Sequence, residues 1–263
     1  MKKPEKAILL TFDVEEFDLP LEHGIAISMD EQMAVGKKGL DVINEILDDL
    51  EINCTLFTTA NFALKYPATI AALSAKHEIA SHTFFHSSFK QEDLKNSRQV
   101  LEDIISKKVY GLRIPRMKKI NAGCIKQAGY TYDSSINPTW IPGRYNNIRM
   151  PRTYYVENGI TRVPVSVSAN FRIPLFWLAF KNFPYSYFKR IALQTLKKDG
   201  YLSLYFHPWE FADLTKYNLP TIVKRKSGIE LLDKLKRFII NFKKEGDFIT
   251  VNSFLKAHPL PIP

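Results

Sequence analysis

Short apolar runs alternate with amphipathic stretches along most of this chain. The apolar runs predict buried strands at residues 7–12, 54–57, 77–80, 110–113, 130–133, 201–206 and 247–251. Between them, apolar residues recur at helical spacing, and they predict helices at residues 40–50, 67–75, 93–106, 121–128, 184–198 and 228–244. Strands that alternate with helices in this way are typical of a parallel sheet.

The number of strands favours one kind of α/β fold, a distorted (β/α) barrel of about seven parallel strands. A dinucleotide-binding sheet would carry Gly-x-Gly-x-x-Gly after its first strand, and this chain has no such segment there. No repeat or linker divides the sequence, so we expect one domain over residues 1–263. Residues 137–183 are rich in proline and aromatic residues, and we expect loops and hairpins there.

Polar clusters follow the predicted strands, at the end where barrels of this kind carry their chemistry. The first strand runs into Asp13, Glu15, Glu16 and Asp18, four carboxylates within six residues. Carboxylates this close repel one another unless they are solvated or neutralised by a cation. The segment is therefore either a polar loop or a source of a metal ligand and a general base, for which Asp13 is available.

Two histidines, His82 and His86, follow the strand predicted at residues 77–80. Histidines four apart on one helical turn project to the same side and can share a metal ion. No glutamate follows the first histidine, so the segment is not the zinc-protease helix. Such pairs also arise by chance, and a base would have to come from elsewhere.

Three more strand ends carry a polar residue with a candidate role. Arg113 is either a surface residue or the partner of a buried carboxylate. Asp133 either orients a neighbour or belongs to a turn. His207, which is followed by Pro-Trp-Glu, is either a core histidine or a general acid.

Together and in this order, the motifs resemble the polysaccharide deacetylases of the NodB-homology type, carbohydrate esterase family 4. The matching segments are Thr11-Phe12-Asp13, His82-Thr83-Phe84-Phe85-His86, Arg113-Ile114-Pro115, Asp133 and Leu204-Tyr205-Phe206-His207. The resemblance extends from residue 7 to about residue 210. The Phe-Asp-Val-Glu, Tyr-Asp-Ser-Ser and His-Pro-Trp-Glu variants resemble a branch linked to exopolysaccharide or cell-wall glycan synthesis.

One departure from the family pattern affects the metal site. The common form has two adjacent aspartates, the first as base and the second as ligand, and Val14 occupies the second position here. By resemblance to the branch with Asp-x-Glu, Glu15 takes the ligand role, with Glu16 and Asp18 as alternatives. The resemblance implies one divalent ion, Zn²⁺ or else Co²⁺, Ni²⁺ or Fe²⁺. Its implied ligands are Glu15, His82 and His86.

The resemblance also implies a mechanism for removal of an N-linked acetyl group from an N-acetylated sugar. Asp13 would take a proton from water, and His207 would protonate the leaving amine. Arg113 would hold Asp13 ionised, and Asp133 would support Arg113 or His207. A backbone N–H near Tyr132 would help to stabilise the oxyanion.

Two other functions remain open from the sequence. Some relatives act on purine-derived amides without a metal ion, so a metal-independent hydrolase of cyclic amides or ureides is one alternative. A catalytically inactive, glycan-binding barrel is the other. The branch carries a Gly-rich segment near residues 169–177, where this chain has Asn170. That segment either reshapes the groove or forms a hydrophobic plug over the barrel.

The amino-acid composition excludes few classes of binding partner. The 18 Phe, 12 Tyr and 3 Trp suit either sugar binding or an aromatic core, and two cysteines do not make a disulfide framework. The net charge of +10 comes with scattered lysines and no nucleic-acid-binding signature. The start of the chain lacks the features of a signal peptide, so we expect a cytoplasmic protein whose basic and aromatic loops touch the membrane surface.

Overall fold

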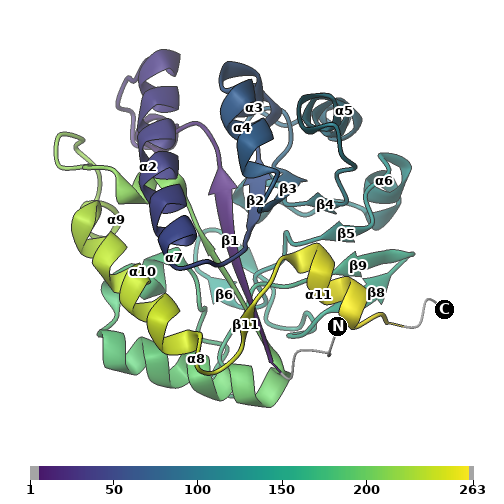
Figure 1. The fold of residues 1–263 in the computed structure, drawn as a ribbon, viewed down its shortest axis with the longest axis vertical. Helices are drawn as coiled ribbons and strands as arrows, with labels where there is room; N and C mark the ends of the chain where they lie inside the picture. Colours follow the sequence, from purple (N-terminus) through teal and green to yellow (C-terminus); the bar gives the residue numbers. More distant parts are fainter. Residues whose placement is uncertain (1–5, 261–263) are drawn as a thin grey trace.

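The computed structural model describes residues 6–260, and within that range a curled, mostly parallel sheet forms a half-barrel (Figure 1). Eight of its strands run parallel, and seven of these follow one another across the sheet. In sheet order they are β10 (Tyr201–Phe206), β1 (Ala7–Val14), β2 (Thr55–Thr58), β3 (Glu78–Ser81), β4 (Gly111–Leu112), β5 (Tyr132–Asp133) and β9 (Ile160–Arg162). The predicted α/β barrel fold is therefore confirmed.

Further short strands complete the sheets. β8 (Tyr155–Glu157) forms an antiparallel hairpin with β9, and β11 (Asp247–Phe248) pairs with the start of β1. β6 (Trp140–Ile141) and β7 (Tyr145–Asn146) make a separate hairpin. The expectation of hairpins in residues 137–183 is therefore correct. Of the segment on which the expectation of no signal peptide rests, residues 1–5 lie outside the described range.

Most of the helices pack around the outside of the sheet (Figure 1). They are α1 (Leu19–Glu22), α2 (Met29–Asp49), α3 (Ala60–Lys65), α4 (Pro67–Leu73), α5 (Asp93–Ile105), α6 (Ala122–Gln127), α7 (Trp177–Asn182), α8 (Tyr185–Asp199), α9 (Thr221–Lys224), α10 (Ile229–Phe242) and α11 (Val251–Ala257). Among residues 6–260, no helix combines the length and the apolar character that crossing a bilayer requires.

Side-chain caps explain where the predicted helix boundaries are wrong. α2 begins at Met29 rather than at residue 40, because the Ser28 hydroxyl accepts the Glu31 N–H at 3.2 Å. Thr59 caps α3 in the same way, and this helix was not predicted. The last strand ends at Phe248 rather than at residue 251, because Thr250 caps α11 there.

Alternate side chains of β1 face opposite sides of the sheet. Ile8, Leu10, Phe12 and Val14 belong to the main core between the sheet and the helices. Ala7 and Leu9 belong to a second cluster, inside the half-barrel. Because successive residues of a strand alternate in direction, the inner row continues through residues 11, 13 and 15. The fold therefore places the carboxylates of Asp13 and Glu15 at the mouth of the barrel.

Helix α2 lies so close to the segment after β10 that only glycine fits at one position. A Cβ on Gly39 would lie 1.8 Å from the backbone carbonyl oxygen of Pro208. We expect Gly39→Ala to lower the free energy of unfolding by about 1–3 kcal/mol through overpacking, although alanine favours helix. Chemical denaturation should show this loss, whereas Lys38→Ala, at the exposed neighbouring position, should show none. Equal stability of the two variants would contradict the tight contact.

Candidate active site

The end of β1 separates its carboxylates onto two sides. Asp13 and Glu15 point into the mouth of the half-barrel, where both line one pocket. Val14 packs in the main core. Glu16 points elsewhere, since its two carboxylate oxygens accept hydrogen bonds from the side chains of Thr59, at 2.9 Å, and Asn61, at 2.6 Å. Glu16 is thus held away from the two histidines.

His82 and His86 meet through a loop, not through a helical turn as the sequence suggested. The chain leaves β3 in an irregular path, and Thr83 has a positive φ of 63°. The backbone N–H of Ala60 donates to the Thr83 carbonyl at 3.0 Å. The loop turns the two imidazole rings face to face, with centroids 5.6 Å apart and planes inclined by 22°.

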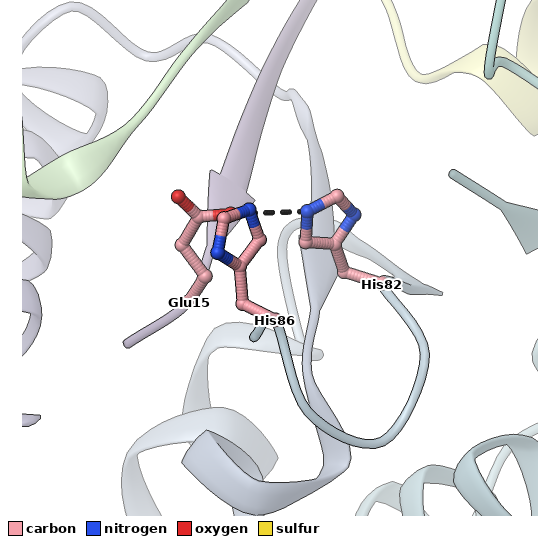
Figure 2. A group of neighbouring side chains, drawn as sticks. All are labelled: Glu15, His82 and His86. Atoms are coloured by element: carbon pink, nitrogen blue, oxygen red, sulfur yellow. Dashed lines mark hydrogen bonds and ion pairs between the residues drawn. The ribbon is translucent and has the colours of Figure 1, made fainter. Parts of the chain in front are cut away.

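Glu15 contacts both imidazoles, and the three side chains gather at one place (Figure 2). Its Oε2 atom is 3.0 Å from His82 Nε2 and 3.2 Å from His86 Nε2. The other nitrogen of each ring, Nδ1, contacts a protein oxygen on the far side of the ring. Nδ1 of His82 lies 2.8 Å from the Arg113 carbonyl, and Nδ1 of His86 lies 2.7 Å from Asp18 Oδ1. Such contacts orient histidines in metal sites and aim their free nitrogens at the ion.

These three residues form a group with metal-ligand geometry. One carboxylate oxygen and two imidazole nitrogens lie within 4.8 Å of one another, and all three residues are buried. A carboxylate with two imidazoles is a donor set that zinc-like ions accept, and three protein ligands leave coordination positions open. Asp18, the alternative ligand, instead accepts hydrogen bonds from His86 and, at 3.1 Å, from Arg116.

Electrostatics within the cluster favour a charged carboxylate. Burial raises the pKa of Glu15, but the neighbouring imidazoles, led by that of His86, outweigh burial and hold this pKa well below its ordinary value. Burial lowers the pKa of His86, but Glu15 and Asp18 outweigh it and raise the pKa to about 9. Without a metal ion, a proton on His86 therefore supplies the positive charge that Glu15 needs.

Asp13 is held by Arg113 and leaves one oxygen toward the pocket. Nη1 of the fully buried Arg113 donates to Asp13 Oδ1 at 2.6 Å and to Thr11 Oγ1 at 2.8 Å. The other end of the guanidinium donates to the Ser134 hydroxyl and carbonyl. Asp13 Oδ2 lies 4.0 Å from His207 Nε2. Asp13 is thus fixed outside the group of Glu15, His82 and His86. Its Oδ2 atom, which Arg113 does not bind, lies beside that group.

His207 faces the cluster from the end of β10. Its Nε2 atom lies 4.0 Å from Glu15 Oε1, and the Trp209 indole N–H donates to the same oxygen at 3.0 Å. On its other side, His207 Nδ1 lies 3.1 Å from Glu210 Oε1. Glu210 Oε2 lies 3.1 Å from the ammonium of Lys181, and both of these side chains are fully buried. An imidazole thus links the pocket to a buried ion pair.

Asp133 lies away from Arg113 and His207, the two partners expected for it. It accepts a hydrogen bond from Arg162 at 2.6 Å and another from the Ser135 hydroxyl. It lines a neighbouring cavity rather than the pocket that holds Asp13. The backbone N–H of Tyr132 donates to the Tyr110 carbonyl at 3.4 Å, so it does not face the pocket as the expected oxyanion donor would.

The pocket is partly open to solvent. Its floor holds the carboxylates and imidazoles, and its walls combine aromatic and aliphatic side chains. Phe176 and Trp177, from the segment that the sequence left as a plug or a reshaped groove, form part of the wall. Phe171 in the same segment is 84% exposed and lies outside the pocket. The segment therefore builds one side of the groove without closing it.

The sequence reasoning missed several residues around this site. Glu210 was visible in His-Pro-Trp-Glu but received no role, although a carboxylate three residues after a histidine can reach its ring. Trp209 belongs to the same motif. Arg116, next to the Arg-x-Pro motif, donates at 2.6 Å to Glu22 as well as to Asp18. Lys181 gave no signal, because its partner lies 29 residues away in the chain.

Comparisons with known proteins agree with this geometry. The polysaccharide deacetylase family matches residues 1–132, just over half of the chain. The chain is therefore a member of the polysaccharide deacetylase family. No curated protein sequence matches it significantly.

Several solved structures share the fold at low sequence identity. A Mycobacterium smegmatis protein described as a polysaccharide deacetylase is 18% identical, with a TM-score of 0.65 over 100% of this chain and 96% of its own. A Pseudomonas aeruginosa PAO1 protein with the same description is 15% identical, with a TM-score of 0.68 over 98% and 94%. The Puue allantoinase is 18% identical, with a TM-score of 0.64 over 99% and 93%.

Proposed function

We propose that this chain, as a single domain over residues 1–263, is a metal-dependent hydrolase that removes N-linked acetyl groups from an N-acetylated sugar. The sugar would belong to a polysaccharide, to peptidoglycan or to a glycan precursor. The observation that carries the proposal is the convergence of Glu15, His82 and His86 within 4.8 Å at the floor of the pocket. Asp13, from the same strand end as Glu15, and His207, from the end of β10, stand beside this group.

A divalent ion, Zn²⁺ or else Co²⁺, Ni²⁺ or Fe²⁺, fits these residues. Glu15 would supply the anionic oxygen, and His82 and His86 would supply their Nε2 atoms. When bound, the ion would lower the pKa of a water molecule and polarise the acetyl carbonyl. The Nδ1 contacts of both histidines support this role, because they leave each Nε2 directed at the shared carboxylate.

Two groups of the chain itself would handle the protons. Asp13 Oδ2 is free of Arg113 and would take a proton from the attacking water. The water oxygen then bonds to the amide carbon. As the carbon–nitrogen bond breaks, His207 Nε2 would give a proton to the nitrogen. The products are acetate and a sugar with a free amine, and both protein groups return to their first state when they exchange the proton.

Glu210 and Lys181 would position His207 for this step. Burial raises the pKa of Glu210, but Lys181 and His207 outweigh it and lower this pKa, so the carboxylate is ionised and accepts the His207 Nδ1–H. That contact leaves Nε2 for the substrate. Loss of this contact should lower kcat by no more than the about 10²–10⁴-fold that a general acid supplies.

The experiment uses a double variant, Glu210→Met with Lys181→Met, because a single change would strand a buried charge at a cost of about 3–5 kcal/mol. Methionine at position 210 also removes the acceptor oxygen, which glutamine would keep. We expect normal metal content, an unchanged KM and a reduced kcat. Nitrogen NMR of the His207 ring should show loss of the fixed Nδ1–H tautomer. An unchanged kcat, or a ring that keeps that tautomer, would remove Glu210 from this role.

Metal binding should release a proton near neutral pH. The His86 pKa of about 9 means that the ion-free protein carries a proton that an incoming metal must displace. Apparent metal affinity should therefore rise with pH, by up to about tenfold per unit, until the pH reaches about 9. Calorimetry in buffers of different protonation enthalpy measures the released proton. If metal binding releases no proton at pH 7, this charge arrangement is wrong.

One alternative has a specific observation in its favour. The fold also resembles the Puue allantoinase, so a metal-independent hydrolase of cyclic amides or ureides is the second candidate. The metal content of the purified protein separates the two, because only the deacetylase needs the ion. A catalytically inactive glycan-binding barrel would bind oligosaccharides without releasing acetate from any of them.

A substrate screen tests the proposed function. Acetate release should be measured from N-acetylglucosamine oligomers, lipid-linked N-acetylated sugars and peptidoglycan fragments, with allantoin as the cyclic ureide. The proposal expects acetate from at least one of the three glycan classes and no ring opening of allantoin. Ring opening without acetate release would favour the alternative hydrolase.

A further inference from the structure

Positive charge is concentrated in one part of this chain. Residues 134–198 contain ten Lys and Arg residues and a single acidic residue, Glu157. This stretch therefore accounts for +9 of the net charge of +10. The same stretch contains the β6–β7 hairpin and the loop at residues 169–173, which lie beside the pocket.

Within residues 140–171 of this stretch, three large apolar side chains are unusually exposed. Phe171 is 84% exposed, Trp140 61% and Ile148 47%. A protein surface that leaves several large apolar groups in water near one another usually marks an interaction site. The three residues come from two separate segments of the chain. They form one surface only if the fold brings these segments together.

Backbone contacts bring these segments together. The Thr139 hydroxyl donates to the Arg172 carbonyl at 2.7 Å, and the Asn147 N–H donates to the Thr139 carbonyl at 2.9 Å. The three exposed apolar residues are each the immediate chain neighbour of one of these bonded residues. We call the set of Trp140, Ile148 and Phe171 the apolar rim.

Cations flank the apolar rim, and one belongs to the pocket wall. Arg144 and Arg149 are both exposed. Arg144 reaches a carboxylate only at 3.5 Å, that of Glu22, and no carboxylate within the described residues lies within 4.0 Å of the Arg149 guanidinium. Arg144 and Tyr145, from the β6–β7 hairpin, line the pocket. The apolar rim therefore stands at the pocket mouth.

The chemistry of this surface favours one class of partner. Protruding aromatic and aliphatic side chains beside two arginines, of which only Arg144 lies near a carboxylate among the described residues, match the interface of an anionic bilayer. A second copy of the chain would bring like charges together across a symmetric contact. A glycan would need acceptors for its hydroxyl groups and a concave surface, whereas Phe171 protrudes.

We propose that the apolar rim, with Arg144 and Arg149, docks the protein on an anionic phospholipid membrane and turns the pocket mouth toward the lipid surface. Trp140 and Phe171 enter the headgroup region, and the arginines contact the lipid phosphates. Resting on the proposed function, the inference also names the substrate class. It is an N-acetylated sugar that is linked to a membrane lipid and is therefore presented at that surface.

Vesicle binding tests the docking independently of catalysis. Co-sedimentation is measured with phosphatidylcholine vesicles and with vesicles that also contain phosphatidylserine. We expect binding only to the anionic vesicles, a loss of at least about tenfold in Trp140→Ser with Phe171→Ser, and a loss of about fivefold in Arg149→Gln. Ile229→Ser is the matched control, because Ile229 on α10 is 77% exposed outside the apolar rim.

The outcomes separate docking from the deacetylase proposal. Trp140 and Phe171 do not line the pocket, so their double variant should release acetate from a water-soluble oligosaccharide at the normal rate but lose activity on a lipid-linked sugar in vesicles. Equal binding to neutral vesicles would overturn the docking. The docking would also be overturned if the protein bound a soluble acidic polysaccharide instead of vesicles. A dimer that the double variant abolishes would overturn it as well. If the unmodified protein releases acetate from none of the substrates, the proposed function alone is overturned.

Discussion

Glu15→Gln is expected to abolish stoichiometric metal binding, with a loss of affinity of more than about 100-fold. The reason is geometric, because Glu15 Oε2 is the atom that both His82 Nε2 and His86 Nε2 approach, at 3.0 Å and 3.2 Å. Removing a residue that only supports a ligand costs about 10–100-fold, and a ligand itself should cost more. Elemental analysis after dialysis measures the metal content.

Glu16→Gln is the matched control, one residue further along. Its carboxylate accepts hydrogen bonds from Thr59 and Asn61 and lies outside the metal-binding group. This variant should keep its metal. Asp18→Asn should give an intermediate loss of about 10–100-fold, because Asp18 holds His86 Nδ1 at 2.7 Å. Metal retained by Glu15→Gln and lost by Glu16→Gln would refute the ligand assignment.

Asp13→Asn is expected to reduce kcat by about 10²–10⁴-fold while the metal stays bound, because it removes the proposed general base. The change is nearly isosteric. The Asn carbonyl can replace Oδ1 as the acceptor of the Arg113 hydrogen bond at 2.6 Å, and its amide then faces the pocket where Oδ2 was free. Steady-state kinetics on the substrate found by the screen, together with metal analysis, separate the two effects.

Arg113→Lys shows whether the rate effect belongs to the carboxylate. A lysine keeps the charge beside Asp13 but cannot make the four hydrogen bonds of the buried guanidinium, which also reach Thr11 and Ser134. This variant should lose stability as well as activity, whereas Asp13→Asn should lose activity at nearly normal stability. Full activity of Asp13→Asn would exclude Asp13 as the base.

The inner row of β1 could be predicted from the sequence, because strand geometry is regular. The two-residue period places Asp13 and Glu15 on one side and Val14 and Glu16 on the other, and the structure has this arrangement. The parallel sheet follows from the regular alternation of strands and helices. Short-range periodicity of this kind needs no knowledge of distant contacts.

The histidine pair shows a limit of the same reasoning. The spacing of His82 and His86 suggested a helical turn, but a loop with Thr83 at positive φ brings the rings together. The backbone of α3, a helix that the sequence reasoning missed, holds this loop through Ala60. Periodicity describes regular elements, so it could not predict an irregular path that depends on a neighbouring element.

Pairing between distant residues was the least predictable part of the site. Asp133 pairs with Arg162, which lies 29 residues further along the chain, rather than with Arg113 or His207. Glu210 pairs with Lys181, 29 residues earlier. Either carboxylate could have reached several cations in a folded chain. Only the packing of the hairpins and of α7 decides which cation lies next to each one.

Metal-dependent acetate release measures the central claim most directly. The purified protein would be stripped with a chelator, dialysed and assayed on N-acetylglucosamine-containing oligomers and lipid-linked sugars before and after addition of one equivalent of Zn²⁺. We expect no acetate from the stripped protein and release restored by the ion, in the unmodified protein but not in Glu15→Gln. Acetate released at the same rate by the stripped protein would contradict the account.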